Sequence, residues 1–378
     1  MKISVGVHGR YHGFDLAREL SCLGHNVDLL TTYPKFIARR FVGSDINLRT
    51  IPRLEILRRG SQKLGLNCEA KIARDFAEFL SRNIYDSEII FGWSSASLEA
   101  IEAAHRKGSK FILERGSAHI LVQNNILQKE YERLGIKWDG IDKEIMAREI
   151  EEYAKADIIC VGSKYSANTF ISQGIDHNKI YVNQYGVNLS SFRSSNRTNT
   201  NQVLKILFAG TVGIRKGIPI LLEAFAKIKT NVELHIIGNL EESIKAIIKK
   251  NQNNNIKIRG PLPSTLMPEE FYNADIFCLP SIEEGFGMVI LQAMAAGLPV
   301  IASDVTGGLE VIRDGEDGIL VPAGNSDKLA EGLEFLIANP DIRLRMGNAA
   351  REKTLQGWDW ANYGQRANTL INMITKAE

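Results

Sequence analysis

The sequence predicts an α/β protein made of two domains, each built on a parallel β-sheet covered by helices. Three observations support this fold class. The chain has 378 residues, 44% of them hydrophobic and 24% charged, which is ordinary for a globular protein and suits two domains. Short apolar, β-branched runs alternate with amphipathic helical stretches from end to end. One polar segment interrupts this alternation near the middle.

The strand-like runs divide into two sets around that polar segment. The first set is Ile3–Val7, Val27–Thr31, Glu88–Phe91, Lys110–Leu113, Ile158–Val161 and Ile180–Val182. The second is Leu204–Phe208, Val232–Ile237, Ile256–Arg259, Ile276–Leu279, Pro299–Ala302 and Gly318–Val321. Near-continuous apolar strands separated by helices are typical of parallel sheets that are buried on both faces.

The polar segment Leu189–Gln202 contains SSFRSSNRTNTNQ, which offers little to a hydrophobic core, and we interpret it as an interdomain linker. We therefore expect domains over 1–188 and 203–355, with a closing helical segment within 356–378. The sequence does not say which domain this last segment contacts.

Composition bounds the function. The net charge of +2 gives no reason to expect nucleic-acid binding. Cys22, Cys68, Cys160 and Cys278 show no CxxC pair, which favours buried thiols in a reducing compartment. The sequence offers neither an apolar signal core nor a run of about 18 apolar residues, so we expect a cytoplasmic protein.

The strongest signal for chemistry is PSIEEGFGM, residues 280–288, which follows the strand-like run Ile276–Leu279. A helix is expected to begin near Phe286, and the free N–H groups of its first turn favour an anion. Gly285 and Gly287 would let a ligand approach the backbone. Glu284 can accept hydrogen bonds from sugar hydroxyls. For such a fragment alone, a strand-to-helix turn with a capping acid is the alternative.

The second signal is FAGTVGIRKG, residues 208–217, another strand, glycine-rich loop and helix start. Arg215 and Lys216 oppose the helix dipole there, which favours an anionic ligand. A solvated cation pair is the alternative. The loop is not a P-loop, because no GK[ST] closes it.

Together these loops resemble the signature of family 4 glycosyltransferases, which are retaining enzymes of the GT-B fold with two Rossmann-like domains facing across a cleft. The resemblance spans nearly the whole chain and is most specific over 204–322. The family pattern is a glutamate, seven residues and a second glutamate. Glu284 matches the first, which implies a contact with the donor sugar. The second falls on Gln292, whose amide can still bond the ribose hydroxyls, without charge assistance.

The resemblance also implies that Arg215 and Lys216 bind the diphosphate. With no DxD-type acidic pair in the sequence, we expect metal-independent transfer, with no cofactor. The donor-binding residues that it implies are Gly13, Arg215, Lys216, Leu262, Gly285, Phe286, Gly287, Met288, Val289 and Gln292. The 1–188 domain would bind the acceptor and the 203–355 domain the nucleotide sugar.

The first domain matches the family more loosely. Its loop over 6–15 has GxxGxxxG spacing and no dinucleotide fingerprint. Where the family has paired glycines, Gly13 fills one place and His12 the other. His119, just past a strand-like run, is assigned as the family's catalytic cleft histidine; an ordinary loop histidine, or His12 in that role, is the alternative. Ser163 is interpreted as a helix N-cap.

The stretch Lys35–Lys63 holds eight cations against Asp45 and Glu55. It is either a solvated helix or loop face, or a surface for an acidic acceptor or an anionic membrane.

We therefore expect a retaining hexosyltransferase that moves sugar from a UDP- or GDP-sugar to a glycan or lipid-linked acceptor in polysaccharide or envelope synthesis. Peripheral contact with the inner face of a membrane fits this role. The alternatives are an inactive nucleotide-sugar-binding subunit, suggested by Gln292, and a nucleotide-sugar epimerase of similar fold.

Overall fold

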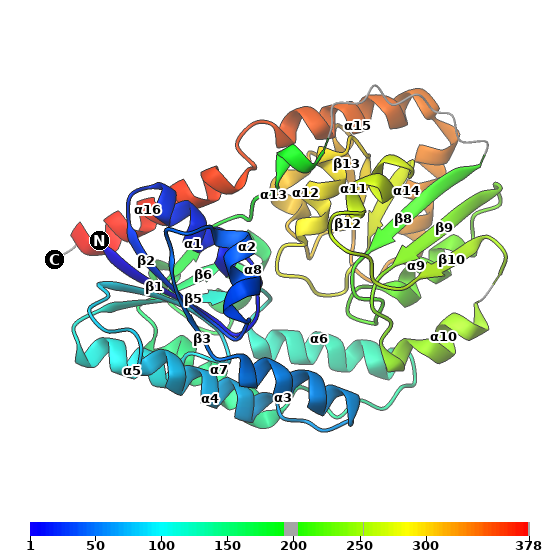
Figure 1. Ribbon diagram of the computed structural model, residues 1–378. Coiled ribbons are helices and arrows are strands. Elements are labelled where there is room, and N and C mark those ends of the chain that lie inside the picture. The colour runs from blue at the N-terminus through cyan, green and yellow to red at the C-terminus, as the bar shows by residue number, and fades with distance from the viewer. Residues whose placement is uncertain (193–202, 252, 377–378) are drawn as a thin grey trace.

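The computed structural model describes residues 1–192, 203–251 and 253–376 (Figure 1). The two predicted sheets are both present, and all of their strand pairs are parallel. Most of the segment interpreted as a linker, residues 193–202, lies outside the described residues.

The first sheet has seven strands in the order β3-β2-β1-β4-β5-β6-β7. They are β1 Lys2–Val7, β2 Asn26–Thr31, β3 Asn47–Thr50, β4 Ile89–Trp93, β5 Lys110–Arg115, β6 Ile158–Val161 and β7 Ile180–Val182. Its helices are α1 Gly13–Cys22, α2 Lys35–Val42, α3 Pro52–Lys63, α4 Glu69–Ser81, α5 Leu98–Arg106, α6 Ile120–Arg133, α7 Lys143–Lys155 and α8 Lys164–Ser172.

Two hydrophobic clusters fill the faces of this sheet, because successive strand side chains point to opposite sides. Ile3, Val5 and Val7 join the cluster that α1 covers. Phe111 and Leu113 join the cluster beneath α4, α5 and α7. The sheet is therefore a buried layer between helices, as its apolar runs predict.

The second sheet has six strands in the order β10-β9-β8-β11-β12-β13. They are β8 Leu204–Ala209, β9 Val232–Ile237, β10 Ile256–Arg259, β11 Ile276–Leu279, β12 Val300–Ser303 and β13 Gly318–Val321. The helices are α9 Ile218–Phe225, α10 Lys245–Lys250, α11 Met267–Tyr272, α12 Met288–Ala295, α13 Gly308–Val311, α14 Ser326–Ala338, α15 Pro340–Thr354 and α16 Trp360–Lys376.

The last helix, α16, leaves the second sheet and returns to the first, where it packs on α1 (Figure 1). A Cβ at Gly364 would collide with the side chain of Glu19, so the two helices approach closely. The His25 Nε2 and Asn368 Oδ1 atoms lie 2.9 Å apart. The closing segment, unassigned from sequence, thus belongs with the N-terminal half.

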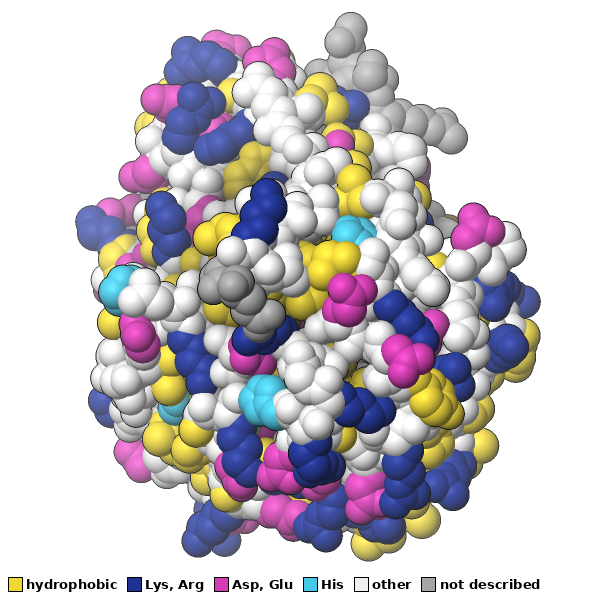
Figure 2. Space-filling model, turned by 90° about the vertical axis from the view of Figure 1, so that its left-hand side faces the viewer, with side chains coloured by type: hydrophobic (Ala, Val, Ile, Leu, Met, Phe, Trp, Pro, Cys, Tyr) yellow, Lys and Arg dark blue, Asp and Glu magenta, His cyan; other side chains and the backbone are white. Residues whose placement is uncertain are grey.

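The sequence-based fold class, two Rossmann-like α/β units facing each other, is confirmed. One strand, β3, was not predicted, because Asn47–Thr50 reads NLRT and lies at a sheet edge. The cationic stretch is mostly helical, since α2 and α3 occupy most of it. On the end of the molecule formed by the first sheet, cations and anions lie interspersed (Figure 2), in keeping with the small net charge.

Candidate active site

A cleft of about 1090 Å³ lies where the carboxyl ends of the two sheets meet. In each sheet the strand order reverses between two neighbours, β1 and β4 or β8 and β11, and ligands of such sheets bind at this switch point. From the first half the cleft is lined by His8, Tyr11, His12, Glu69, Trp93, Ser94, Ser95, Arg115, Gly116, Ser117, Gln123 and Tyr185. From the second it is lined by Ala209, Gly210, Thr211, Arg215, Lys216, Ile237, Gly238, Asn239, Pro261, Leu262, Met267, Glu284, Phe286, Gly287, Met288, Val289 and Gln292.

The charged rim of the second half consists of Arg215, Lys216 and Glu284. Lys216 forms an ion pair with Glu284, and Arg215 Nη1 lies 3.7 Å from Glu284 Oε2. Burial alone would raise the pKa of Glu284, but the charges of Lys216 and Arg215 outweigh it and lower this pKa. The carboxylate is therefore ionised at neutral pH, beside two cations that can meet an anion.

The turn that presents these cations depends on glycine. Gly217 has a φ of +72°, and a Cβ there would collide with the carbonyl oxygen of Pro280. A side chain at this position would thus push apart the loops after β8 and β11, which are the two loops that the resemblance assigned to the donor.

The helix after β11 begins at Met288, two residues later than expected, because Gly287 takes a φ of +80° as its N-cap. Phe286, Gly287, Met288 and Val289 all line the cleft. Gln292 follows Met288 by about one helical turn and lines it too. Leu262 belongs to the same wall.

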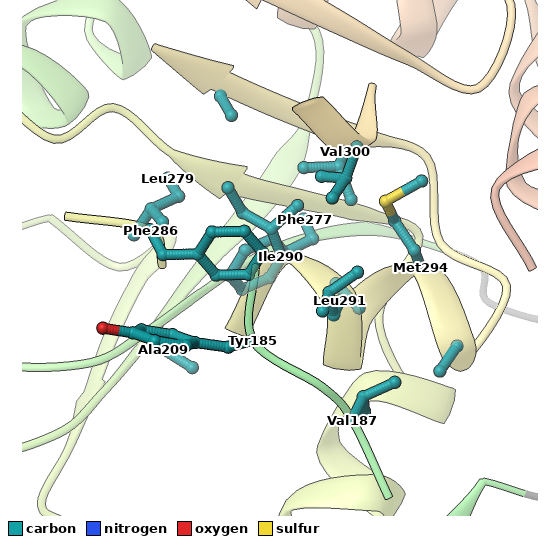
Figure 3. Packing of buried hydrophobic residues seen from close by; sticks show 14 of the residues in the cluster. Tyr185, Val187, Ala209, Phe277, Leu279, Phe286, Ile290, Leu291, Met294 and Val300 are labelled. Atoms are coloured by element: carbon teal, nitrogen blue, oxygen red, sulfur yellow. The ribbon is translucent and has the colours of Figure 1, made fainter. Parts of the chain in front are cut away.

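An aromatic contact joins the two halves at the base of this loop. Figure 3 shows the Phe286 ring beside Leu279 and Ile290, with Tyr185 below it in this view. The Tyr185 and Phe286 ring centroids are 5.2 Å apart. Within the described residues the buried Tyr185 hydroxyl has no hydrogen-bond partner, although the residue lines the cleft.

The rim of the first half carries histidines. His12 Nε2 lies 3.2 Å from Glu114 Oε2, and its ring lies between those of Trp93 and Tyr185, with centroids 5.0 Å and 4.2 Å away. Burial, with a smaller contribution from the charge of Arg58, lowers the pKa of His8 to about 4. His8 is therefore neutral at physiological pH.

Arg115 is the buried cation of this rim, and its guanidinium is fully engaged. Nη1 donates to Glu149 Oε1 at 3.0 Å, Nη2 donates to Gln123 Oε1 at 2.8 Å, and Nε donates to the Ala118 carbonyl at 3.2 Å. Burial opposes the charge, but the carboxylates, Glu149 foremost, raise the pKa of Arg115. This cation shapes the loop after β5 more than it offers free donors to a ligand.

His119 is not among the residues that line this cleft, and its sequence-based assignment stays a prediction. It is the N-cap of α6, where its Nδ1 accepts from the Leu121 N–H at 3.3 Å. Its ring packs against Tyr153 and Phe170, with centroids 4.9 Å and 5.1 Å away. Burial, assisted by Arg115, lowers its pKa to about 4. His12, the alternative, does line the cleft.

Two glycines assigned to donor binding, Gly13 and Gly285, are likewise not among the residues that line the cleft. Gly13 opens α1 against Val7 and Trp93, where a Cβ would crowd both side chains. Gly285 faces the first half, and a Cβ there would collide with the backbone of Gly116. Both positions need glycine because of close packing.

Ser163 is an N-cap, as predicted, and its hydroxyl oxygen accepts a hydrogen bond from the Ser166 N–H at 3.1 Å.

Some residues around the site were missed from sequence. Glu283 is fully buried between the halves, and its carboxylate contacts both of them. Glu149 and Glu152 reach the loop after β4 from α7, where Ser95 has a φ of +75°. Their i, i+3 spacing on a predicted helix was the available signal, but it is also that of an ordinary solvated face.

The cysteines are all free thiols; Cys160 and Cys278 are buried, but Cys22 is exposed, contrary to expectation. In the described residues we find no group of three or more His, Cys, Asp or Glu that could hold a metal ion. Nor does any helix in that part of the chain have the length and apolarity needed to cross a membrane.

Residues 191–353 match the family described as glycosyl transferases group 1. A phosphatidyl-myo-inositol mannosyltransferase of Mycobacterium leprae is 35% identical over 183 residues, which cover 47% of this chain and 49% of that protein. The capsular polysaccharide biosynthesis glycosyltransferase CapM of Staphylococcus aureus is 29% identical over 250 residues, covering 61% and 65%. The chain thus spans about half to two thirds of the length of these relatives.

Solved structures share the fold over the full length. Sucrose-phosphate synthase from Thermosynechococcus elongatus matches with a TM-score of 0.72 at 18% identity, covering 100% of both chains. HepE from Anabaena, in complex with UDP-glucose, matches with a TM-score of 0.74 at 16% identity, covering 98% of this chain and 100% of that one. At such identities the likeness is one of fold.

Proposed function

We propose that the chain, whose residues 191–353 match the group 1 glycosyl transferases, is a retaining, metal-independent hexosyltransferase that uses a UDP- or GDP-sugar. The observation that carries the proposal is the rim formed by Arg215, Lys216 and Glu284 at the switch point of the second sheet. Two cations beside an ionised carboxylate suit a ligand that carries both a diphosphate and sugar hydroxyls.

In the proposed reaction the diphosphate binds Arg215 and Lys216, and it competes with Glu284 for the Lys216 ammonium. The freed carboxylate then accepts hydrogen bonds from the sugar. The bond between the anomeric carbon and the phosphate oxygen breaks while a bond to the acceptor oxygen forms. The acceptor's hydroxyl proton passes to the departing phosphate oxygen. Arg215, Lys216 and the N–H groups at the start of α12 stabilise the charge on the leaving diphosphate.

We assign the donor to residues 203–355 and the acceptor to residues 1–188. The first rim presents the rings of Tyr11, Trp93 and Tyr185 beside the hydroxyls of Ser94 and Ser95. Aromatic faces with small polar groups suit a glycan, since sugars expose both C–H faces and hydroxyls. A glycan or lipid-linked acceptor in polysaccharide or envelope synthesis fits this surface. The names of two similar proteins, the capsular polysaccharide biosynthesis glycosyltransferase CapM and the phosphatidyl-myo-inositol mannosyltransferase, support this kind of acceptor.

We also propose a peripheral contact between α2–α3 and an anionic membrane. Three large apolar side chains stand out beside these helices: Phe36 is 69% exposed, Ile56 72% and Leu64 74%. The same stretch of sequence carries seven cations: Lys35, Arg39, Arg40, Arg53, Arg58, Arg59 and Lys63. Apolar side chains among cations suit the interface of an anionic bilayer, where each cation contributes about 1 kcal/mol.

Vesicle sedimentation tests the membrane contact. The protein should co-sediment with phosphatidylglycerol vesicles and stay in solution with phosphatidylcholine vesicles. The double variant Phe36→Ser, Ile56→Ser should lose this binding. Phe335→Ser, which removes an exposed ring from α14 in the second half, is the matched control and should retain it. Equal binding by both variants would contradict the assignment.

The donor is tested by thermal shift over nucleotides and nucleotide sugars, followed by a transfer assay. A ligand at 100 times its dissociation constant stabilises the fold by about 2.7 kcal/mol. UDP or GDP, with the matching sugar nucleotide, should give such a shift. Slow release of UDP or GDP from the donor would exclude an inactive binding subunit, whereas formation of an epimer from the donor alone would favour an epimerase.

A further inference from the structure

Glu283 lies next to Glu284 but does not share its place in the cleft. Its side chain is fully buried between the two halves of the molecule. Oε1 accepts from the Ser117 hydroxyl at 2.7 Å and from the Ala118 N–H at 2.8 Å. Oε2 accepts from Gln123 Nε2 at 3.0 Å. Glu283 belongs to the second half of the molecule, but its carboxylate accepts hydrogen bonds from three donors of the first half.

On its own side Glu283 contacts Arg215. The Arg215 Nη1 atom lies 3.4 Å from Glu283 Oε2 and donates to the Glu283 carbonyl at 3.2 Å. The same nitrogen lies 3.7 Å from Glu284 Oε2 at the cleft. One guanidinium therefore contacts both the rim assigned to the diphosphate and the buried Glu283 carboxylate. We call the contacts of Glu283 with the two halves the bridge.

A second contact holds the same loop to the first half without touching Arg215. The Gly285 carbonyl accepts from the Ser163 hydroxyl at 2.6 Å and from the Ser166 hydroxyl at 3.2 Å. These two serines belong to the start of α8. The loop after β11 is therefore hydrogen-bonded to the first half at two residues, Glu283 and Gly285. Of these two, only the side chain of Glu283 contacts Arg215.

Burying a carboxylate costs several kcal/mol unless donors surround it. Most donors to Glu283 come from the loop after β5 and from α6, so its burial is offset when the two halves are closed on each other. In that arrangement its charge also fixes the direction in which Arg215 points. Closure and the aim of the guanidinium are thus linked through one side chain.

We propose that Glu283 is a positioning residue that couples closure of the two halves to the presentation of Arg215 toward an anionic ligand. This inference rests on the donor site proposed above. Glu283 acts through Arg215 and does not itself contact the donor. A carboxylate suits this position, since both of its oxygens accept from neutral donors of the first half while Oε2 also faces the Arg215 cation.

Two substitutions of Glu283 affect its contact with Arg215 and its contacts with the first half to different extents. Glu283→Gln keeps an oxygen for Ser117 and Ala118 but loses the charge that holds Arg215, together with the acceptor for Gln123 Nε2. We expect UDP or GDP binding to weaken about tenfold, which corresponds to about 1.4 kcal/mol, while the Ala118 amide stays protected from hydrogen exchange. Glu283→Ala should weaken binding at least as much and also speed exchange at Ala118.

Ser163→Ala is the matched control, because it loosens the same loop without touching Arg215. It removes an N-cap and should lower the stability of the protein, but UDP or GDP affinity should change less than twofold. Equal losses of affinity in Glu283→Gln and Ser163→Ala would reduce Glu283 to a structural role and overturn the proposal. So would an unchanged affinity in Glu283→Gln.

The proposed donor and the proposed coupling can fail separately. A wild-type protein that binds neither UDP nor GDP would refute the donor. The bridge is then judged by hydrogen exchange at Ala118 and by the radius of gyration in solution. Faster exchange and a larger radius in Glu283→Ala support it, and values equal to those of the wild type overturn it.

Discussion

On the second-half rim of the cleft, Glu284 pairs with Lys216 and lies near Arg215, which also contacts the buried Glu283, whereas on the opposite rim Arg115 is enclosed by Glu149, Gln123 and a backbone carbonyl. The pairs of the first group can exchange for a ligand, because Lys216 and Glu284 both line the cleft. Of the partners of Arg115, Gln123 also lines the cleft, but Glu149 and the Ala118 carbonyl belong to the surrounding fold and serve to hold a loop.

A charged side chain at the rim of a cleft is therefore not enough to predict that it binds a ligand. A cation whose partner faces the same cavity is poised to change partners when an anion arrives. A cation whose partners are structural keeps them. The rims therefore predict different responses to substitution, strongest on the second half.

The largest effect is expected from Glu284→Ala. Transfer should fall at least about 100-fold, the loss typical for removing one group that stabilises a transition state, while unfolding stability changes little. Glu69→Ala, which removes a carboxylate from the opposite rim, should cost less than tenfold. The two variants are compared by measuring their initial rates of transfer and their thermal unfolding. Equal losses, or near wild-type turnover in folded Glu284→Ala, would erase the distinction between the rims.

Lys216→Ala should weaken UDP or GDP binding by about tenfold or more. It removes a charge-assisted contact worth about 1.5–3 kcal/mol and leaves the Glu284 carboxylate to repel the diphosphate. Calorimetric titration measures this, and the loss should be the same with EDTA present. Activity of the wild type that EDTA alone abolishes would contradict the metal-independent mechanism.

A smaller gain is expected from Gln292→Glu. If residue 292 contacts the ribose, a carboxylate replaces a neutral bond of about 1 kcal/mol by a charge-assisted one, for a net gain of about 1 kcal/mol or roughly fivefold tighter binding. The gain should vanish with a 2′-deoxy nucleotide. Identical ribose preference in the wild type and the variant would show that residue 292 does not touch the sugar.

The smallest effect concerns His119, now placed in the packing of the first half. Its folded pKa of about 4 lies below the usual 6.5, so below pH 6.5 the unfolded chain binds a proton that the folded chain does not. Stability should fall as the pH drops from about 6.5 to about 4, by at most about 1.4 kcal/mol per pH unit for this group.

His119→Asn should flatten that dependence and keep the cap, since Asn caps helices well. Urea unfolding at several pH values measures it, with the exposed His177→Asn as control. A residual slope is expected from His8, whose pKa is also about 4. An unchanged slope in His119→Asn would contradict this placement.

Much of the fold could be predicted, because apolar β-branched runs have few structural options. β6, β7, β9, β10, β11 and β13 coincide with their predicted ranges, whereas the polar edge strand β3 carries too little apolar signal.

The loops that line the cleft from the second half were equally predictable, since glycine-rich loops after strands leave a local signature. The bridge through Glu283 was not, because Ser117, Gln123 and Arg215 each lie 68 or more residues from Glu283 in sequence and meet it only in the folded chain. His119 follows a central strand as a cleft residue would, yet three-dimensional packing turned it toward Tyr153 and Phe170.

The return of α16 to the first half has a consequence for how the protein is made. A growing chain emerges from the ribosome in sequence order, and domains fold as they appear. The surface of α1 that α16 covers therefore stays exposed throughout synthesis of the second half. Buried contacts of Tyr363, Ala367, Leu370 and Ile371 form after more than 350 residues have been made. The part of the molecule that is synthesised first is thus completed last.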